Sequence, residues 1–360
     1  MGECKLTDTS NALPVIISTD NSGGVFDAKT WPGGAPMDDF AAIMQALNEP
    51  GIKVCQIAAM FGNYEATASR VVTDFLKKHK PEAQGIPVYT GAALDVFTRE
   101  YDRTVWFNED LKLERMFPEE RPCHELPRTL GINDAVSNMH EQLRTEPAAI
   151  LALGPLTDVA ALVYNFPDVV ENIKKVVWLG GRSALSQLPA PNPNDPKEVF
   201  HDLNYDRDPG SVDVVLKSGV KFVAVGGGLA FNADPPIKGL VDLLQGGTKK
   251  TDTKLRRYAR GLAEQITQLG LLDTFPFDSI GLAALLFEDC WFDCVEMGAK
   301  ILKCGKTAPD FDGNVCTAPD ETTALWFSDK FPSNGKTFFC QEFRNKGSEK
   351  MQTRIREMTY

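Results

Sequence analysis

The sequence predicts an α/β protein with an open, mainly parallel β-sheet and helices on both faces of the sheet. Three observations support this fold class. Strand-like and helix-like segments alternate up to about residue 290, the strand-like segments are continuous apolar runs, and 43% of the 360 residues are hydrophobic. Strands without polar alternation are buried on both faces, as in a parallel sheet covered by helices.

The expected elements follow one another in a regular order. Strands are expected where aliphatic residues run without interruption, at residues 14–19, 54–60, 86–90, 148–153, 175–179 and 221–225. Helices are expected where apolar residues recur at helical spacing, at residues 40–47, 65–79, 159–164 and 211–218. We expect one domain over 1–360, with a recognisable core at about 14–290. The last sixty residues lose the βα rhythm, so 300–360 is poorly readable.

The composition argues against several classes of function. The formal net charge is -11 and the pI is about 5.0, which does not suit a groove for nucleic acid. No run reaches the roughly 20 apolar residues of a membrane helix, and residues 1–11 lack an apolar signal segment. Eight cysteines are scattered along the chain, and only Cys290 and Cys294 lie close together. We therefore expect reduced thiols, a cytoplasmic location, and neither a nucleic-acid nor a membrane partner.

Acidic residues lie where several expected elements begin or end. Asp20 follows the first strand, Asp38 and Asp39 open the first helix, and Asp278 precedes the apolar run 281–287. Ligands of open parallel sheets bind at the carboxyl ends of the strands. Carboxylates that converge there repel one another unless a cation lies between them, and oxygen ligands select calcium or magnesium. Taken singly, each of these residues could instead simply cap a helix or end a strand.

The order of these and other motifs resembles the inosine-uridine type of nucleoside hydrolase. Asp20 and the Asp-Asp-Phe-Ala-Ala-Ile run at 38–43 resemble that family's D-x-D-x-G-x-D-D cluster. Further likenesses follow in family order over about 14–287: Phe61-Gly-Asn63, the segments 87–92, 153–157 (LGPLT, resembling the family's GPLTN) and 178–181, Asp202-Leu-Asn204 with Asp208-Pro209, and Asp278. The resemblance implies a Rossmann-like nucleoside hydrolase fold.

The resemblance also implies an activity, which is calcium-dependent hydrolysis of the N-glycosidic bond of ribonucleosides to ribose and free base. It implies Ca²⁺ ligands from Asp20, Asp39, Asp278 and the main-chain carbonyl of Leu153. Asp20 would also take a proton from water. The sugar would be bound by Asp38, Asn63 and Asn204.

The chain departs from the family pattern at several positions. Ser18 replaces the first acid of D-x-D, and residues 24–36 are inserted where relatives have a tight turn. The insertion is either a surface elaboration or a flap whose Trp31 stacks on the base. Asp202 replaces a glutamate that contacts the ribose 5′-hydroxyl, and that end of the sugar is expected to meet either Asn192 or Asn194.

Phe277 occupies the position before the late aspartate. Pyrimidine-accepting relatives have a histidine there that protonates the leaving base, whereas purine-preferring relatives have an aromatic residue that stacks on it. The resemblance therefore implies a purine riboside as substrate. His201 is the only histidine near a motif, and no leaving-group acid can be assigned.

Other functions remain alternatives. A catalytically degenerate relative that binds ribosides or another sugar is suggested by Ser18 and Asp202. A haloacid-dehalogenase-like phosphotransferase needs Asp-x-Asp, which Asp20-Asn-Ser22 lacks. A dinucleotide-binding dehydrogenase needs G-x-G-x-x-G before a helix, and no helix is evident after Gly226-Gly-Gly228. The partner expected is a small nucleoside, and a homodimer or homotetramer is the default assembly.

Overall fold

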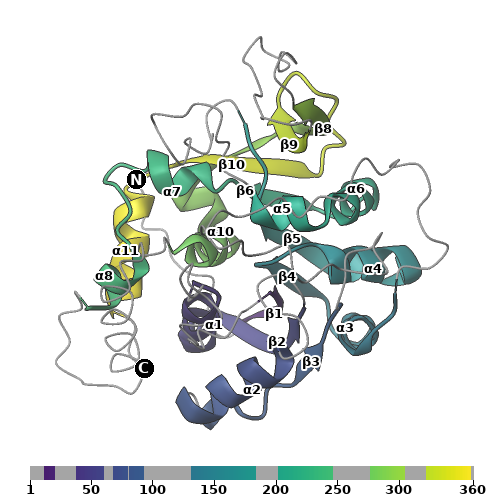
Figure 1. Ribbon diagram of the computed structural model, residues 1–360, viewed down its shortest axis with the longest axis vertical. Helices are drawn as coiled ribbons and strands as arrows, with labels where there is room; N and C mark the ends of the chain where they lie inside the picture. The colour runs from purple at the N-terminus through teal and green to yellow at the C-terminus, as the bar shows by residue number, and fades with distance from the viewer. Residues whose placement is uncertain are drawn as a thin grey trace, which may run out of the picture.

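An eight-stranded sheet forms the centre of the protein in a computed structural model (Figure 1). The structure describes residues 12–20, 38–60, 68–79, 81–92, 131–183, 202–245, 276–304 and 322–357. The strand order is β3-β2-β1-β4-β5-β6-β10-β7. Every neighbouring pair is parallel except β10 and β7, which are antiparallel. The predicted mainly parallel α/β fold is therefore confirmed.

The elements occur close to the predicted positions in the first part of the chain. The strands are β1 (Leu13–Thr19), β2 (Ile52–Ala59), β3 (Val88–Thr90), β4 (Ala148–Ala152), β5 (Ile173–Leu179), β6 (Phe222–Val225), β7 (Phe292–Glu296), β8 (Gly298–Cys304), β9 (Thr322–Ser328) and β10 (Thr337–Phe343). The α-helices are α1 (Asp38–Asn48), α2 (Ala68–His79), α3 (Asp134–Thr145), α4 (Thr157–Asn165), α5 (Leu203–Arg207), α6 (Pro209–Lys217), α7 (Gly228–Asn232), α8 (Leu240–Gln245), α10 (Phe277–Trp291) and α11 (Gly347–Glu357). Within the described residues, 3-10 helices lie at Pro81–Ala83 and Pro167–Asn172.

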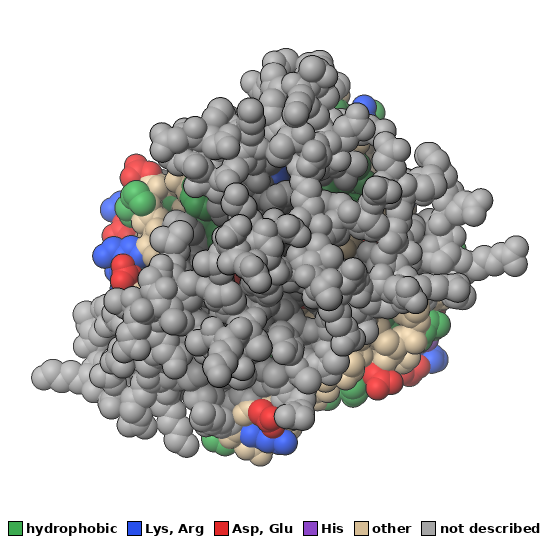
Figure 2. Space-filling model, viewed as in Figure 1, with side chains coloured by type: hydrophobic (Ala, Val, Ile, Leu, Met, Phe, Trp, Pro, Cys, Tyr) green, Lys and Arg blue, Asp and Glu red, His purple; other side chains and the backbone are tan. Residues whose placement is uncertain are grey.

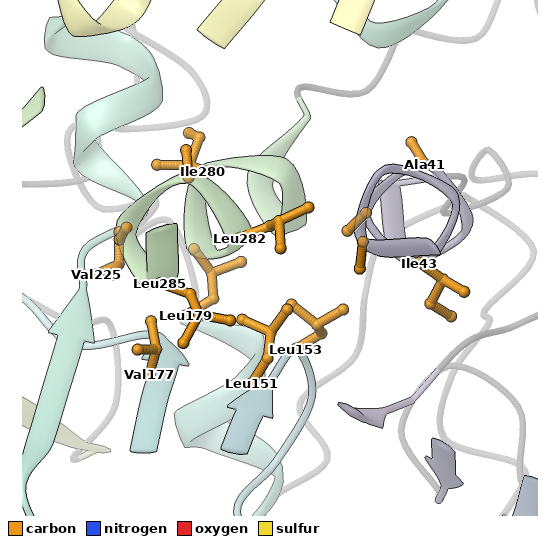
Figure 3. Packing of buried hydrophobic residues seen from close by; sticks show 14 of the residues in the cluster. Ala41, Ile43, Leu151, Leu153, Val177, Leu179, Val225, Ile280, Leu282 and Leu285 are labelled. Carbon is orange, nitrogen blue, oxygen red and sulfur yellow. The ribbon is translucent and has the colours of Figure 1, made fainter. Parts of the chain in front are cut away.

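The sheet is buried on both faces, because successive residues of each strand point to opposite sides. On one side, Ile17 and Leu151 pack against α1 and α10; on the other, Ile16 and Ile150 pack against α3, α4 and α6. Figure 3 shows α10 lying over the strand ends with α1 beside it. Leu285 of α10 points to the strand side chains, which include Leu151, Val177, Leu179 and Val225, Leu282 points toward α1, and Ile280 is on the side of α10 away from these strands. This packing explains why the strands read as continuous apolar runs.

The strand order reverses at β1. The chain runs from β1 through α1 to β2 on one side of β1, and later returns to form β4 on its other side. Connections on either side of such a reversal diverge and leave room for a ligand at the carboxyl ends of the strands. The carboxyl ends of β1 and β4 are therefore the favoured place for a site.

The C-terminal part of the chain, poorly readable from the sequence, completes the sheet. β10 pairs with β6 in parallel and with β7 in antiparallel orientation, while β8 and β9 form a separate two-stranded sheet. α11 packs against α8 and α10. The main sheet thus extends well past the predicted core of about 14–290.

Two expectations about local structure are wrong. Cys294 and Cys340, opposite each other on β7 and β10, form a disulfide, and Cys290 is also disulfide-bonded, so these thiols are not reduced. Spacing along the sequence could not pair residues 46 positions apart that meet only across a sheet. A helix does follow Gly226-Gly-Gly228, since α7 begins at Gly228, although it has only five residues.

Acidic and basic side chains lie side by side where described residues reach the face drawn in Figure 2. Ion pairs between exposed side chains, for example Lys53 with Glu146 and Lys217 with Asp213, agree with this mixture of charges. Among the described residues, no helix is long and apolar enough to cross a bilayer.

We expect Gly181 to be far less replaceable than Gly335. Both have positive φ, +87° and +74°, so alanine costs about 1–2 kcal/mol at either position. A Cβ on Gly181 would lie 2.4 Å from Cε2 of the buried Phe327, whereas one on Gly335 meets nothing within 4 Å. Urea unfolding should show that Gly181→Ala loses about 1–3 kcal/mol more than Gly335→Ala. Equal losses would mean that Phe327 moves aside at little cost.

Candidate active site

Four aspartates meet at the carboxyl ends of the central strands. Asp20 directly follows β1, Asp38 and Asp39 are the first residues of α1, and Asp278 is the second residue of α10. α1 and α10 lie side by side on the same face of the sheet, which brings their first turns to the end of β1. Asp38 and Asp39 are the first two residues of α1 rather than residues ahead of it. Their negative charges there interact favourably with the positive end of the helix dipole.

All four carboxylates are withdrawn from water. Asp20 is 2%, Asp38 8%, Asp39 2% and Asp278 3% exposed. One oxygen from each of Asp38, Asp39 and Asp278 lies within 4.8 Å of the others. Oxygen ligands of this kind suit a hard cation such as calcium, magnesium or manganese, whose coordination shell water and substrate oxygens would complete. These residues therefore fit a metal ion.

Burial raises the pKa of every member of the cluster. Desolvation raises the pKa of Asp20 from 3.8 to about 6, against the attraction of the Arg207 charge. It raises that of Asp38 to about 7, where the neighbouring Asp20 charge adds to the rise. Desolvation followed by mutual repulsion raises the pKa of Asp39 and Asp278 well above 3.8. The cluster therefore favours either bound protons or a cation near neutral pH.

Asp20 differs from the other three acids in its partners. Its Oδ2 accepts a hydrogen bond from Nη1 of Arg207, the last residue of α5, in a buried ion pair. Its other side lies against Gly154, where a Cβ would come within 2.7 Å of the Asp20 Cβ and 2.9 Å of Oδ1. Asp20 does not belong to the group of carboxylates whose oxygens gather within 4.8 Å.

The loop after β4 is fixed by hydrogen bonds to its main-chain oxygens. Asn204 Nδ2 donates to the carbonyl oxygen of Leu153 at 2.9 Å and to that of Leu179 at 3.0 Å. Trp178 Nε1 donates to the carbonyl of Gly154 at 3.0 Å. The Leu153 carbonyl predicted as a metal ligand therefore already accepts one hydrogen bond from Asn204, which was predicted to bind the sugar.

Two other predicted residues lie near the ends of β5 and α10. Asp202 caps α5, accepting from the main-chain N of Gly181 at 2.5 Å and of Tyr205 at 3.3 Å. Phe277, half-buried, opens α10 beside Asp278, and its ring lies 6.1 Å from that of Phe231 on α7. Phe231 was not anticipated from the sequence, because it belongs to the short helix after the glycine run.

A family model described as inosine-uridine preferring nucleoside hydrolase matches residues 32–337. The chain belongs to this family. The matched span includes Asp38, Asp39 and Asp278 but begins after Asp20, so the assignment of Asp20 to the site rests on its position at the end of β1 beside α1.

Individual relatives are distant. The chain is 26% identical over 216 residues to the non-specific ribonucleoside hydrolase RihC of Salmonella newport and 27% identical over 215 residues to that of Klebsiella pneumoniae. These alignments cover 60% and 59% of this chain and 61% of each relative, so the match spans less than two thirds of the curated relatives' length.

Solved structures share the fold. A plant nucleoside hydrolase superposes with a TM-score of 0.62 at 18% identity, covering 96% of this chain and 98% of its own. A purine-preferring ribonucleoside hydrolase from Gardnerella vaginalis gives 0.63 at 14% identity, covering 95% and 98%.

Several predicted site residues of this nucleoside hydrolase family member fall outside the described residues. They are Trp31, in the inserted segment 24–36, and Asn63, Asn192, Asn194 and His201. The described residues bring together Asp20, Asp38, Asp39, Asp278, Leu153 and Asn204, with Asp202 and Phe277 on neighbouring elements.

Sequence reasoning missed two charged residues. Arg207 could have been noticed as a lone basic residue in the acidic run Asp202-Leu-Asn-Tyr-Asp-Arg-Asp208. Asp158 occupies the position of the asparagine in the family's GPLTN stretch and is fully buried in the first turn of α4. Its Oδ1 accepts from Ala92 N at 2.9 Å and Asn133 Nδ2 at 2.8 Å.

We expect Asp158→Asn to reduce the pH dependence of stability. Burial raises the pKa of Asp158 from 3.8 to about 6, so the folded state binds its proton more tightly than the unfolded state. The contribution of Asp158 to the free energy of unfolding is therefore fully present below about pH 4 and is lost as the pH rises to about 6. At about 1.4 kcal/mol per pKa unit, the loss is up to about 3 kcal/mol. Asparagine keeps the Oδ1 acceptor without the charge.

The free energy of unfolding of both proteins can be measured by chemical denaturation in the presence of a chelator at pH 4.5, 6 and 7.5. The fall in the free energy of unfolding between pH 4.5 and pH 7.5 should be about 2 kcal/mol smaller in Asp158→Asn than in the unmodified protein. Asp213→Asn, which removes a partly exposed carboxylate paired with Lys217, controls for overall charge and should follow the unmodified profile. Identical profiles for Asp158→Asn and the unmodified protein would contradict this account.

Proposed function

We propose that this chain hydrolyses the N-glycosidic bond of ribonucleosides, with Ca²⁺ as its metal ion and a purine riboside as preferred substrate. The observation that carries the proposal is the convergence of four buried aspartates from β1, α1 and α10 where the strand order reverses. A surface cluster would be hydrated and need no counter-charge, whereas this one favours a cation or bound protons. Family membership supports the reaction class.

The chain's own residues supply the parts that such a hydrolysis needs. Asp39 and Asp278 would hold the ion together with Asp20 and the Leu153 carbonyl, the ligands that the resemblance implies, and Asp38 is close enough to Asp39 and Asp278 to be a further ligand. The ion would make water easier to deprotonate. Asp20, at the end of β1, would accept that proton. Negative charge in the cluster would stabilise the positive character of the sugar as the bond breaks.

The purine preference rests on Phe277. This residue presents a partly exposed ring beside Asp278 and has no proton to give, so it favours a base that stacks well. Purine ring nitrogens can take a proton from water, which reduces the need for an enzyme acid. RihC is named non-specific, so the preference is a proposal about this chain alone.

A second candidate function is riboside or sugar binding without cleavage. The buried Asp20–Arg207 pair favours it, because the carboxylate proposed as the base is already engaged by a guanidinium.

A homodimer or homotetramer is proposed from symmetry alone. A cytoplasmic location is the sequence-based proposal, and the Cys294–Cys340 disulfide weighs against it, since disulfides persist mainly in oxidising compartments.

Removal of metal should abolish hydrolysis. The unmodified protein, assayed for ribose release from inosine, should lose activity in chelator and regain it with calcium, because the acidic cluster needs a cation to ionise fully. Full activity in exhaustive chelator, with no metal found by elemental analysis, would refute the metal mechanism.

Asp20→Asn should lower kcat by at least about a hundredfold, since it removes the base. Asp293→Asn, at the Arg344 pair away from the site, is the matched control and should leave kcat unchanged.

Replacing Phe277 should change base preference. Phe277→Leu keeps an apolar side chain against the core but removes the stacking face. Stacking is worth roughly 1–3 kcal/mol per base, so kcat/KM for inosine should fall by about ten- to a hundredfold and that for uridine by less. Phe343→Leu, which removes a ring packed on Phe292 elsewhere, serves as the control. If the unmodified enzyme cleaves uridine as well as inosine, the purine assignment is wrong.

A further inference from the structure

Arg207 carries a buried positive charge into the acidic cluster. Its side chain is 4% exposed and its Nη1 donates to Oδ2 of Asp20, which is 2% exposed. The two residues are 187 positions apart, so the fold alone creates this pair. Because burial withdraws both charges from water, their attraction is screened far less than that of a surface pair.

Short, well-anchored helices hold Arg207 in place. α5 begins at the Asp202 cap, and Asn204 ties it to the main-chain carbonyls of Leu153 and Leu179. Directly after Arg207, Asp208 caps α6 and accepts a hydrogen bond from Thr157 Oγ1 at 2.5 Å. The backbone at Arg207 is therefore held on both sides along the chain.

Asp20 lies beside its acidic neighbours but outside their closest group. Asp38, Asp39 and Asp278 bring their oxygens within 4.8 Å of one another, and Asp20 is outside that group, between Arg207 and the main chain of Gly154. A cation held by the three gathered carboxylates must compete with Arg207 for the fourth. Arg207 also repels any cation that enters, because like charges in a poorly screened site raise each other's energy.

We propose that Arg207 is an internal counter-cation that weakens divalent metal binding and holds Asp20 out of the ligand set until metal displaces it. Arg207 is thus a positioning residue that acts through Asp20. This inference rests on the proposed function, since it assumes that the acidic cluster is the metal site. It implies a site that binds its ion less tightly, and releases it more readily, than the same four carboxylates would without the arginine.

The test is calorimetric titration of the full-length, metal-stripped protein with CaCl₂ alone. Arg207→Gln keeps a hydrogen-bond donor for Asp20 but removes the charge, so it should bind calcium about tenfold or more tightly than the unmodified protein. Arg207→Lys keeps the charge and should restore an affinity within about threefold of the original. Arg354→Gln is the matched control, because it removes a guanidinium on α11 that pairs with Glu49 and not with the acidic cluster. It should not change the affinity for calcium.

The outcomes separate this inference from the proposed function. If the unmodified protein binds calcium and Arg207→Gln binds it equally or more weakly, the role of Arg207 is refuted while the metal site stands. If neither protein binds calcium at millimolar concentration, both proposals fail. Should Arg207→Gln not fold, a crystal structure of the unmodified protein with calcium decides: the inference requires that Asp20 no longer contacts Arg207, and an intact pair beside a bound ion overturns it.

Discussion

Four acidic side chains removed from water at one point are the constraint on which the rest of the site depends. A buried carboxylate without a partner costs several kcal/mol, and four together cost more because each repels the others. The fold answers with the positive ends of two helices, α1 and α10, the hydroxyl of Thr19 on Asp39, and the guanidinium of Arg207 on Asp20. These contacts lower the energy of the buried charges but do not balance all four of them. The negative charge that remains favours binding of a cation.

Much of the sheet could be predicted because its signals are local. β1, β4 and β5 are runs of aliphatic residues that read as doubly buried strands, and their carboxyl ends could be located from the residues that follow. β10 could not be placed in the same way. Its neighbours are β6, more than a hundred residues earlier, and β7, and pairing with either depends on contacts that no local pattern encodes. The disulfide between Cys294 and Cys340 was missed for the same reason.

The acidic residues of the site were predictable because aspartates at strand ends and helix starts are conspicuous. The role of Arg207 was harder to predict: the residue is visible as a lone basic residue in an acidic run, but its pairing with Asp20, 187 positions away, is created only by the fold. Asn204 was identified by its motif, but its hydrogen bonds to two main-chain carbonyls became visible only in three dimensions. Residue types, in short, revealed which groups attract a ligand, whereas the groups that restrain them depend on tertiary contacts.

The late insertion of β10 between β6 and β7 matters for how the chain is made. A ribosome delivers β6 more than a hundred residues before β10, so the growing chain presents an open strand edge during that interval. β7, whose partner in the main sheet is β10, must wait as well. Nascent chains with exposed edges are prone to associate with one another or to recruit chaperones. Synthesis of this protein therefore has a vulnerable stage that ends only when residues 337–343 leave the exit tunnel.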